Sequence, residues 1–412
     1  MNIVPSIPLS APRVEERLRL AFTGEGGAFL RLLIRGGLLL IPTLGFYRFW
    51  LITDVRRYLW GNTHVGGETL EYTGTARELV IGFLIALTVL TPLYVFYFIL
   101  GLLAEEIQAF ASIPLALVLY VFGHYAAFRA RRYRATRTVF RGVRFWMTGS
   151  AWSYAGRAAF WDLLVLLTLG LAYPWRAATL ERYKMRHTRF GDLAGGFDGR
   201  ALTFFKRGVL LWLVAVGVPV LVCMIAVLQV LRGSNSAGAG QPVGFGPAVA
   251  VVAALMLLPL MFPLFQAIQL RWTLDGIRFG PVEAESDLPK SKVYGLYARM
   301  VLVLVGFGLV AAVAMGIIGG MASDSFGSLA EGTTAITPAL ALALGLTALA
   351  YLGLLIGFGI VTRYFLGRGL WAAAVASVTL ANLSSADGVI AMGAPASSVG
   401  EGLADALDVG AF

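Results

Sequence analysis

The fold class is decided by an uncharged stretch at Leu79–Ala104, which reads LVIGFLIALTVLTPLYVFYFILGLLA. A helix needs about 20 apolar residues to cross a bilayer, and this stretch exceeds that length. Other uncharged stretches are also long enough to cross. They are Ile107–Phe128, Gly208–Leu231, Pro247–Leu270, Met300–Ser323 and Pro338–Thr362. The sequence therefore predicts a polytopic membrane protein.

The composition favours the same class. Of the 412 residues, 58% are hydrophobic and 14% are charged, whereas soluble domains have about 25% charged residues. A soluble protein of this size needs a far more charged surface to stay in solution. The chain has a single cysteine, Cys223, which excludes an intramolecular disulfide and a cysteine metal cluster. A soluble globular protein, a disordered chain and a disulfide scaffold are thereby excluded.

Basic residues lie on one side of the predicted spans. The spans form three hairpins, and of the 33 basic residues only Arg232 falls in a loop within a hairpin. The loops on the opposite side are strongly basic, and residues 129–144 alone contain seven arginines. By the positive-inside rule these loops are cytoplasmic, so both termini are predicted to be cytoplasmic. The net charge of +10 is therefore explained by the orientation of the chain in the membrane and by contact with anionic lipid headgroups. We predict no binding of nucleic acid.

Two apolar stretches, Gly36–Tyr47 and Leu163–Trp175, are shorter. Each has a basic loop on both sides, and a helix that begins and ends on one side of the membrane cannot cross it. We therefore predict that both are re-entrant or interfacial helices, which membranes tolerate where protein or water surrounds the irregular backbone. The alternative is two ordinary short spans whose flanking loops carry atypical charge.

Many positions recur at a constant spacing of 125 residues, which indicates an internal repeat. The first copy contains Thr43, Gly45, Trp50, Arg57, Tyr58 and Gly74. Their counterparts are Thr168, Gly170, Trp175, Arg182, Tyr183 and Gly199. Looser copies of the Arg-aromatic pair occur at Arg132-Tyr133 and Arg271-Trp272. We infer two tandem repeats that run in the same direction, each a short helix plus a hairpin, followed by a third hairpin.

The segments after the Arg-Tyr pairs favour short β-hairpins. The segment Thr63–Tyr72 alternates around Gly66-Gly67, a pattern typical of a hairpin turn. The predicted fold class is an all-α polytopic membrane protein with three transmembrane helical hairpins, two short re-entrant or interfacial helices and small cytoplasmic β-hairpin connectors. The predicted segments are a cytoplasmic N-terminal segment (1–21), membrane repeat 1 (22–146), membrane repeat 2 (147–271), a third hairpin unit (272–366) and a cytoplasmic tail with an interfacial helix and an acidic end (367–412).

Side chains suited to catalysis are scarce. The chain has three histidines and lacks the His-Glu-x-x-His, Walker and Gly-x-Ser-x-Gly motifs. We therefore predict that it is not an enzyme and that it holds no metal or cofactor. Asp162 adjoins the second short apolar stretch, and an ionisable residue at membrane depth suggests function. The candidate polar site is Asp162 paired with Arg157, which could bind a cation or relay a proton; the alternative is a structural charge near the cytoplasmic edge.

Several motifs also carry a family resemblance. They are FTGEGGAF from Phe22, TLGFYRFW from Thr43, RRYLWGNT from Arg56, EYTG from Glu71 and the closing GEGLADALDVGAF. In combination they resemble the YjgN-like family of bacterial inner-membrane proteins of uncharacterised function, and the resemblance extends from Phe22 to Phe412. It implies a bacterial inner-membrane location and supplies no catalytic residues. Members of that family are often encoded beside a membrane-associated zinc metallopeptidase, so the resemblance also suggests such a partner.

Two functions are open at this point. The first is transport or permeation of ions or small solutes, because tandem repeats and re-entrant segments recur in transporters. The second is a non-enzymatic scaffold or lipid-organising protein that recruits a partner such as the metallopeptidase. The acidic tail would either dock under the basic connectors or recruit that partner, and a homo-oligomer is compatible with both functions. We rank transport slightly ahead of the scaffold.

Overall fold

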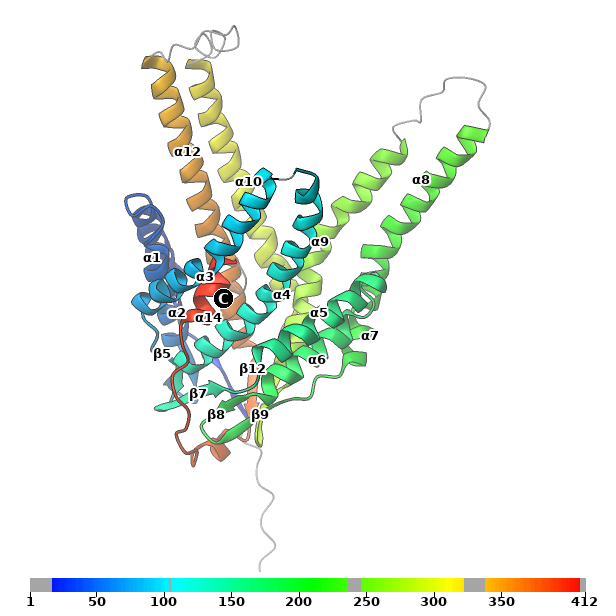
Figure 1. Cartoon of the computed structure of the whole chain (residues 1–412). Coiled ribbons are helices and arrows are strands. Elements are labelled where there is room, and N and C mark those ends of the chain that lie inside the picture. The colour runs from blue at the N-terminus through cyan, green and yellow to red at the C-terminus, as the bar shows by residue number, and fades with distance from the viewer. Residues whose placement is uncertain (1–16, 104, 236–245, 322–337, 408–412) are drawn as a thin grey trace, which may run out of the picture.

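Helices and strands occupy separate layers of the molecule (Figure 1). A computed structural model describes residues 17–103, 105–235, 246–321 and 338–407. The helical pairs extend from one side of a β-layer, and the longest pairs fan apart as they leave it. The N-terminal residues 1–16, the predicted hairpin loops at 236–245 and 322–337 and the last five residues lie outside the described part.

The helices come in short and long pairs. The short pairs are α1 (Gly26–Leu40) with α2 (Arg48–Gly61) and α5 (Ala151–Leu167) with α6 (Tyr173–Arg186). The long pairs are α3 (Ala76–Leu103) with α4 (Glu105–Arg137), α7 (Ala201–Trp212), η1 (Leu213–Gly217) and α8 (Val218–Asn235) with α9 (Gly246–Asp275), and α10 (Lys290–Met321) with α12 (Pro338–Thr362). The π-helical segment η2 (Arg363–Gly369) then leads from α12 into α13 (Leu370–Ala376).

Long apolar helices confirm the membrane-protein class. Among the described residues, five helical runs are long and apolar enough to cross a membrane. They are Ala76–Leu102, Ile113–Arg137, Ala201–Ile225, Lys290–Gly320 and Leu340–Ala376. Their outer faces carry exposed apolar side chains, such as Leu210 and Leu302, each 72% exposed. Contiguous exposed apolar surface of this kind is typical of a membrane-facing surface.

The two short apolar stretches are not single helices, so this detail of the prediction was wrong. A turn divides Gly36–Tyr47 after the end of α1, and another divides Leu163–Trp175 after the end of α5. Each stretch is therefore the reversal between two helices. Strand β2 (Ala21–Phe22) precedes α1 and β3 (Thr63–Val65) follows α2, so both ends of this short pair lie at the β-layer. The pair α5–α6 lies between two strands in the same way.

Both reversals have the same backbone geometry. Gly45 and Gly170 have φ angles of 86° and 93°, a region that glycine enters without steric cost. The hydroxyls of Thr43 and Thr168 donate hydrogen bonds to carbonyls four residues earlier, at 2.6 and 2.7 Å. The Thr-Leu-Gly motif of the sequence therefore encodes a helix-to-helix reversal at both places.

The strands form one connected antiparallel system. In chain order they are β1 (Arg17–Arg19), β2, β3, β4 (Glu68–Thr69), β5 (Glu71–Tyr72), β6 (Thr138–Phe140), β7 (Val143–Met147), β8 (Thr188–Phe190), β9 (Leu193–Phe197), β10 (Ile277–Phe279), β11 (Val282–Ser286) and β12 (Val378–Ala381). One sheet has the order β1-β12-β11-β10-β9-β8-β7-β6-β5, and a second has the order β2-β3-β4. The predicted hairpin at Thr63–Tyr72 is confirmed, with Gly66-Gly67 at its turn.

Two bent strands close this system into a ring. Leu20 joins β1 to β2, and its amide donates to the Val378 carbonyl at 3.0 Å. Leu70 joins β4 to β5, and its amide donates to the Thr63 carbonyl at 3.1 Å. Each bent strand therefore belongs to both sheets, and the pairing continues around a closed circle. Closure leaves no long unpaired edge in this circle to attract another strand.

Apolar side chains fill the ring. Val65, Phe140, Phe190, Val282 and Leu383 form one buried cluster. Since the strands of the first four lie all around the ring, these side chains meet at its centre. The prediction of an all-α protein was therefore wrong, because the connectors are parts of a large antiparallel sheet. Strands of two to five residues are too short to show a clear alternation of hydrophobic residues. Pairing between distant segments completes them.

The segment set apart as a tail, 367–412, is part of the fold. Strand β12 lies between β1 and β11, and the 3₁₀ turn η3 (Leu383–Ala386) contributes to the cluster inside the ring. The chain then returns toward the helical layer, where α14 (Val399–Ala406) packs against α3 and α4 (Figure 1). The C-terminal segment therefore joins the β-layer to a helical pair.

Candidate functional site

Asp162 lies on α5 at the centre of a polar cluster that joins three helices. Its Oδ2 accepts a hydrogen bond from the Tyr120 hydroxyl at 2.5 Å and lies 3.1 Å from Nε2 of His124. Arg176 of α6 donates to Oδ2 at 3.1 Å and also contacts Oδ1. Both carboxylate oxygens are therefore engaged, which compensates a charge that would be costly at membrane depth. The cluster ties α5 and α6 to α4.

Arg157, the predicted partner of Asp162, lies against a different group. Its guanidinium carbon is 4.6 Å from the centroid of the Tyr183 ring, a cation–π contact. The structure pairs Asp162 with Arg176 instead. The reversal between α5 and α6 brings these two residues together, so the pairing could not be read from close spacing in the sequence.

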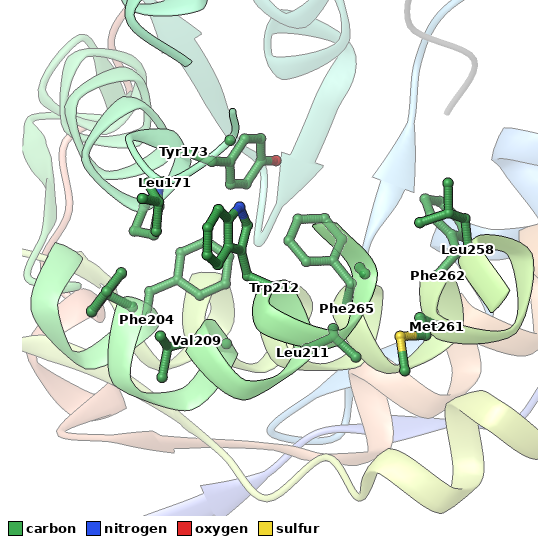
Figure 2. A pocket seen from close by; sticks show the side chains of 15 residues that line it. Leu171, Tyr173, Phe204, Val209, Leu211, Trp212, Leu258, Met261, Phe262 and Phe265 are labelled. Atoms are coloured by element: carbon green, nitrogen blue, oxygen red, sulfur yellow. The ribbon is translucent and has the colours of Figure 1, made fainter. Parts of the chain in front are cut away.

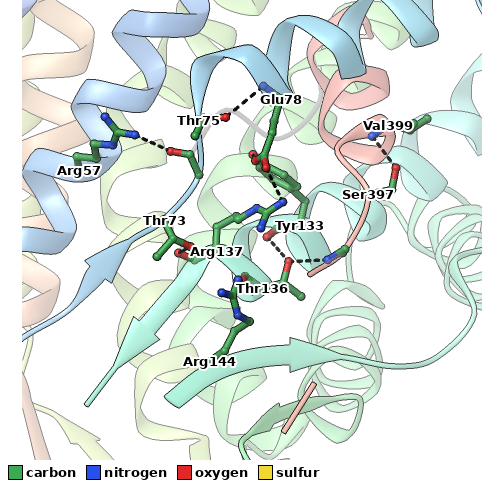
Figure 3. Close-up of polar contacts among 12 residues, drawn as sticks. Arg57, Thr73, Thr75, Glu78, Tyr133, Thr136, Arg137, Arg144, Ser397 and Val399 are labelled. Carbon is green, nitrogen blue, oxygen red and sulfur yellow. Dashed lines mark hydrogen bonds and ion pairs between the residues drawn. The ribbon is translucent and has the colours of Figure 1, made fainter. Parts of the chain in front are cut away.

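The repeated Arg-Tyr positions fasten the connectors to the helices. Arg57 donates to the Gly74 carbonyl at 3.0 Å, and Arg182 donates to the Gly199 carbonyl at 3.2 Å; Figure 3 shows the first contact. The tyrosine after each arginine donates its hydroxyl to a carbonyl in the preceding connector, at 2.6 and 2.8 Å. Each Arg-Tyr pair thus joins two successive connectors, which assigns these repeat residues a structural role.

The repeated tryptophans lie close to the two reversals. Trp50 stacks on Tyr47, with ring centroids 6.2 Å apart, and Trp175 contacts Phe205, with centroids 5.4 Å apart. Trp50 and Trp175 remain 45% and 41% exposed. Both indole rings therefore remain partly exposed on the outside of the short pairs, beside the reversals.

Helix α14 lies in a seat between α3 and α4, and glycines allow the approach. A Cβ atom on Gly402 would lie 2.0 Å from the backbone of Gly82, and one on Gly400 would lie 2.3 Å from the Arg129 side chain. The apolar residues of the seat are Ala86, Ala126 and Ala130, which pack against Leu403 and Ala404. Small residues on both sides therefore let α14 pack almost backbone to backbone.

A buried charge cluster holds α14 in this seat. Arg56 contacts Oε1 of Glu401, and Arg134 lies 3.5 Å from the same oxygen. Arg56 also donates to the Tyr72 hydroxyl at 3.1 Å. Burial alone would lower the pKa of the Arg56 guanidinium, but the charge and hydrogen bonds of Glu401 and Tyr72 outweigh burial and raise it. The acidic C-terminal segment thus docks beside basic residues, one of the two outcomes that the sequence left open.

The chain that leads to α14 is also fixed in place. Asp387 pairs with Arg141 at 2.5 Å, and the Ala396 amide donates to the Thr136 hydroxyl at 3.2 Å (Figure 3). These contacts lie along the end of α4 and the strands that follow it. The path from β12 to α14 is therefore anchored before the helix begins.

An apolar pocket of about 300 Å³ lies between the α5–α6 reversal, α7 and α9 (Figure 2). Its fifteen lining residues are uncharged, and Tyr173, Phe204, Trp212 and Phe265 form much of its wall. The Trp212 indole donates to the Leu169 carbonyl at 2.8 Å, which holds its ring against the reversal. The volume lies at the lower end of the usual range for ligand pockets, about 300–1,000 Å³.

Equivalent backbone hydrogen bonds relate α3–α4 to α7–α9. The Thr73 amide donates to the Arg137 carbonyl at 2.8 Å, and the Asp198 amide donates to the Gly276 carbonyl at 2.9 Å. Residues of α7 therefore correspond to α3 residues 125 positions earlier, and residues of α9 correspond to α4 residues 139 positions earlier. These offsets allow the two parts of the chain to be compared residue by residue.

With these offsets, the pocket and the seat of α14 occupy equivalent places. Leu211 and Phe265 line the pocket, and their counterparts Ala86 and Ala126 line the seat. The C-terminal helix α14 fills this place beside α3 and α4, whereas an apolar pocket lies at the equivalent place beside α7 and α9. The charges of the two places differ as well, because Glu181 is the counterpart of Arg56. A helix like α14, with a buried glutamate, would therefore find no arginine to pair with beside the pocket.

Sequence reasoning missed both the pocket and the seat. The 125-residue spacing could have located equivalent positions, but which of them holds a helix depends on the path of the C-terminal segment. The closing Gly-Glu-Gly, residues 400–402, was a usable signal, because two glycines around an acid suit a closely packed helix with a buried charge. Within the described residues, no three His, Cys, Asp or Glu side chains are grouped to hold a metal ion.

Comparisons with known proteins identify relatives but no solved homologue. The model of a family described as "Bacterial protein of unknown function (DUF898)" matches residues 17–406. The inner membrane protein YjgN of Escherichia coli K12 is 26% identical over 152 residues, which cover 37% of this chain and 36% of that protein. YjgN of Salmonella typhimurium is 27% identical over 150 residues, 36% of this chain and 35% of that protein. The chain thus aligns with about a third of the length of these relatives. No solved structure matches it.

Proposed function

The chain belongs to the DUF898 family of bacterial proteins of unknown function, and on its geometry we propose that it is a lipid-organising protein of the inner membrane. Its relatives are named inner membrane proteins. The proposal rests on the apolar pocket between the α5–α6 reversal, α7 and α9, which would hold a lipid acyl chain. This develops the second of the two functions that the sequence left open.

The chemistry of the pocket favours an acyl chain over a polar solute. All of its lining residues are uncharged, and aromatic rings form much of the wall. A buried ion or sugar would lack hydrogen-bond partners there, which is costly, whereas an alkyl chain needs none and gains dispersion contacts with the apolar wall. The equivalent place beside α3 and α4 holds a helix whose contact side chains include Leu403 and Ala404, so apolar groups occupy that place, which supports an apolar occupant for the pocket.

Transport, which ranked first from the sequence, gains no comparable support. The β-ring is filled by apolar side chains, and both oxygens of Asp162 are engaged by neighbouring residues. A cation that bound Asp162 would have to displace Arg176. Lipid organisation needs neither a free carboxylate nor a path through the ring.

We further propose that the short pairs α1–α2 and α5–α6 are re-entrant hairpins beside the long transmembrane pairs. Both ends of each short pair join the β-layer, and the layer carries the basic connectors that favour a cytoplasmic location. The shared reversal geometry and hydrogen bonds support a tandem repeat of a short pair and a long pair. Because α14 is docked in its seat, we propose that a protein partner such as the metallopeptidase would bind the outer surface of the β-layer instead.

The test is to fill the pocket and measure retained lipid. A Cβ atom on Gly208, which lines the pocket, meets no heavy atom within 4 Å, so Gly208→Leu places a side chain there without a backbone clash. We expect the wild-type chain, purified in mild detergent, to retain phospholipid in a fixed ratio to protein. Gly208→Leu should retain clearly less, measured by mass spectrometry of extracted lipid.

Gly306→Leu is the matched control. Gly306 lies on α10, outside the pocket lining, and its Cβ position is equally open, so the same substitution adds the same apolar surface elsewhere. The control should retain as much lipid as the wild type. If Gly208→Leu and Gly306→Leu retain equal amounts, the pocket does not hold the lipid and the proposal fails.

A further inference from the structure

A second cavity, of about 610 Å³, lies on the β-layer beside β9 and the end of α6. Its charged lining residues are Arg182, Arg186, Arg200, Arg278 and Asp198. Four guanidinium groups therefore surround this cavity with a single carboxylate. A concave surface lined by one sign of charge concentrates its field and attracts ions of the opposite sign.

Small residues of β9 create the hollow. The strand contains Ala194, Gly195 and Gly196 at positions where β7, fifty residues earlier, has Arg144, Phe145 and Trp146. A Cβ on Gly195 would lie 2.6 Å from two backbone carbonyl oxygens, so that position requires glycine.

At the equivalent place one unit earlier the hollow is smaller, about 210 Å³, and Trp146 and the C-terminal segment form part of its wall. Trp146 corresponds to Gly196, and its ring packs against Gly393 of the C-terminal segment. The Ala396 amide is bonded to Thr136, which corresponds to Arg186. The cavity on β9 is thus a larger copy of a place that the C-terminal segment partly covers elsewhere, and arginine replaces threonine at its edge.

Two of the four arginines are held by neighbouring groups. Arg182 donates to the Gly199 carbonyl at 3.2 Å, and Arg278 pairs with Asp198. The other two, Arg186 and Arg200, are exposed at the cavity. After the pair between Arg278 and Asp198, three guanidinium groups still lack a carboxylate among the lining residues. A ligand with two or more negative charges would match this excess.

We propose that this cavity binds an anion that carries a phosphate group, either on an anionic lipid headgroup or on a soluble phosphate ester. The planar guanidinium presents several N–H donors that match phosphate oxygens, and the volume suits a small ligand. The proposal does not rest on the acyl pocket, because Arg, Asp and strand residues line this cavity and apolar helix residues line the other. The two can therefore fail separately.

The test measures binding of two phosphate probes to the full chain in uncharged detergent. Sodium pyrophosphate represents a soluble phosphate ester, and dihexanoyl phosphatidylglycerol represents a lipid headgroup; dihexanoyl phosphatidylcholine is the zwitterionic reference. Titration calorimetry is run at about 150 mM salt, where interactions of distant exposed charges are largely screened. At least one phosphate probe should bind the wild type with a stoichiometry of one.

Two kinds of variant locate the site. The double variant Arg186→Gln/Arg200→Gln removes two exposed charges that, unlike Arg182, are not bonded to a connector. It should weaken binding about 100-fold, since each charged hydrogen bond contributes about tenfold to the affinity. Ala194→Glu keeps every arginine and adds a carboxylate at an exposed position in the lining of the cavity. It should also abolish most binding. Arg77→Gln removes an exposed arginine at the start of α3 and should leave binding unchanged.

Each outcome has a defined meaning. Binding of phosphatidylglycerol alone identifies a lipid headgroup site, and binding of pyrophosphate alone identifies a site for a soluble phosphate ester; both support the proposal if the cavity variants lose binding. Failure of both probes to bind the wild type overturns it. Equal affinity in the wild type and both cavity variants, or an equal loss in Arg77→Gln, also overturns it, because binding then follows net charge alone.

Discussion

Neutralising Glu401 should release the C-terminal helix α14 from its seat. Its side chain is 9% exposed and that of Arg56 is 6% exposed, so water screens the pair poorly. Glu401→Gln keeps the shape and one acceptor oxygen but removes the negative charge. Arg56 and Arg134, which both face the carboxylate, would then be buried positive charges opposite a neutral amide.

The magnitude follows from this burial. Breaking a buried ion pair by removing one partner costs about 3–5 kcal/mol, because the other charge stays desolvated. The neutral amide oxygen of glutamine still accepts a hydrogen bond from Arg56, so we expect about 3 kcal/mol, the lower end of that range. Helix α14 has eight residues and can leave its seat without opening the ring, so the cost should appear as local release.

Amide hydrogen exchange of residues 399–406 measures this release. An opening free energy lowered by about 3 kcal/mol makes exchange through local opening faster by roughly 100-fold. Glu285→Gln is the control: Glu285 lies 3.4 Å from Arg17 and its side chain is 63% exposed, and pairs of this kind contribute about 0–1 kcal/mol. Its α14 exchange should match the wild type.

Either of two results would refute this reasoning. If α14 of Glu401→Gln exchanges as slowly as in the wild type, the charges do not hold the helix and glycine packing alone seats it. If exchange rises equally throughout the molecule, the carboxylate supports the whole fold rather than α14. In both cases the local assignment of the 3 kcal/mol would be wrong.

Three further predictions concern packing, pH and topology. Gly402→Ala should also speed exchange in α14, because its Cβ would lie 2.0 Å from the Gly82 backbone, while an alanine at the open position Gly306 should not. Burial and three neighbouring arginines lower the pKa of His187, so the folded state disfavours its protonation; stability should therefore fall as pH drops below about 6.5, and thermal melting of His187→Gln should lose less between pH 7.5 and pH 5.5. Reporter fusions after Ser150 and after Phe190 should both report the cytoplasm, and opposite sides would exclude a re-entrant α5–α6 hairpin.

Local patterns predicted the helices well. As far as its residues are described, each long uncharged stretch of the sequence lies in a helix, because a run of about 20 apolar residues is stable in lipid whatever its neighbours are. The hairpin at Thr63–Tyr72 was also predicted, since Gly66 and Gly67 favour the turn by themselves. Such features depend on residues that are close in the chain.

The candidate site was predicted less well, for a geometric reason. Asp162 was identified as an important charge, but its partner Arg176 lies beyond a helix reversal, and the local choice of Arg157 was wrong as a contact. The seat of α14 joins residues more than 300 positions apart, such as Arg56 and Glu401. No local spacing indicates such a pair.

The sequence by itself determined that this is a helical membrane protein with basic connectors, a Thr-Leu-Gly motif repeated in each half and β-hairpins after the Arg-Tyr pairs. Each of these follows from the burial of apolar side chains in lipid or from local backbone preference. Only the tertiary structure decided that the connectors join into one ring, that β12 pairs with β1, and that α14 fills one of two equivalent places. Those results depend on pairing between the two ends of the chain, whose contacts are made only when all the intervening helical pairs are in position.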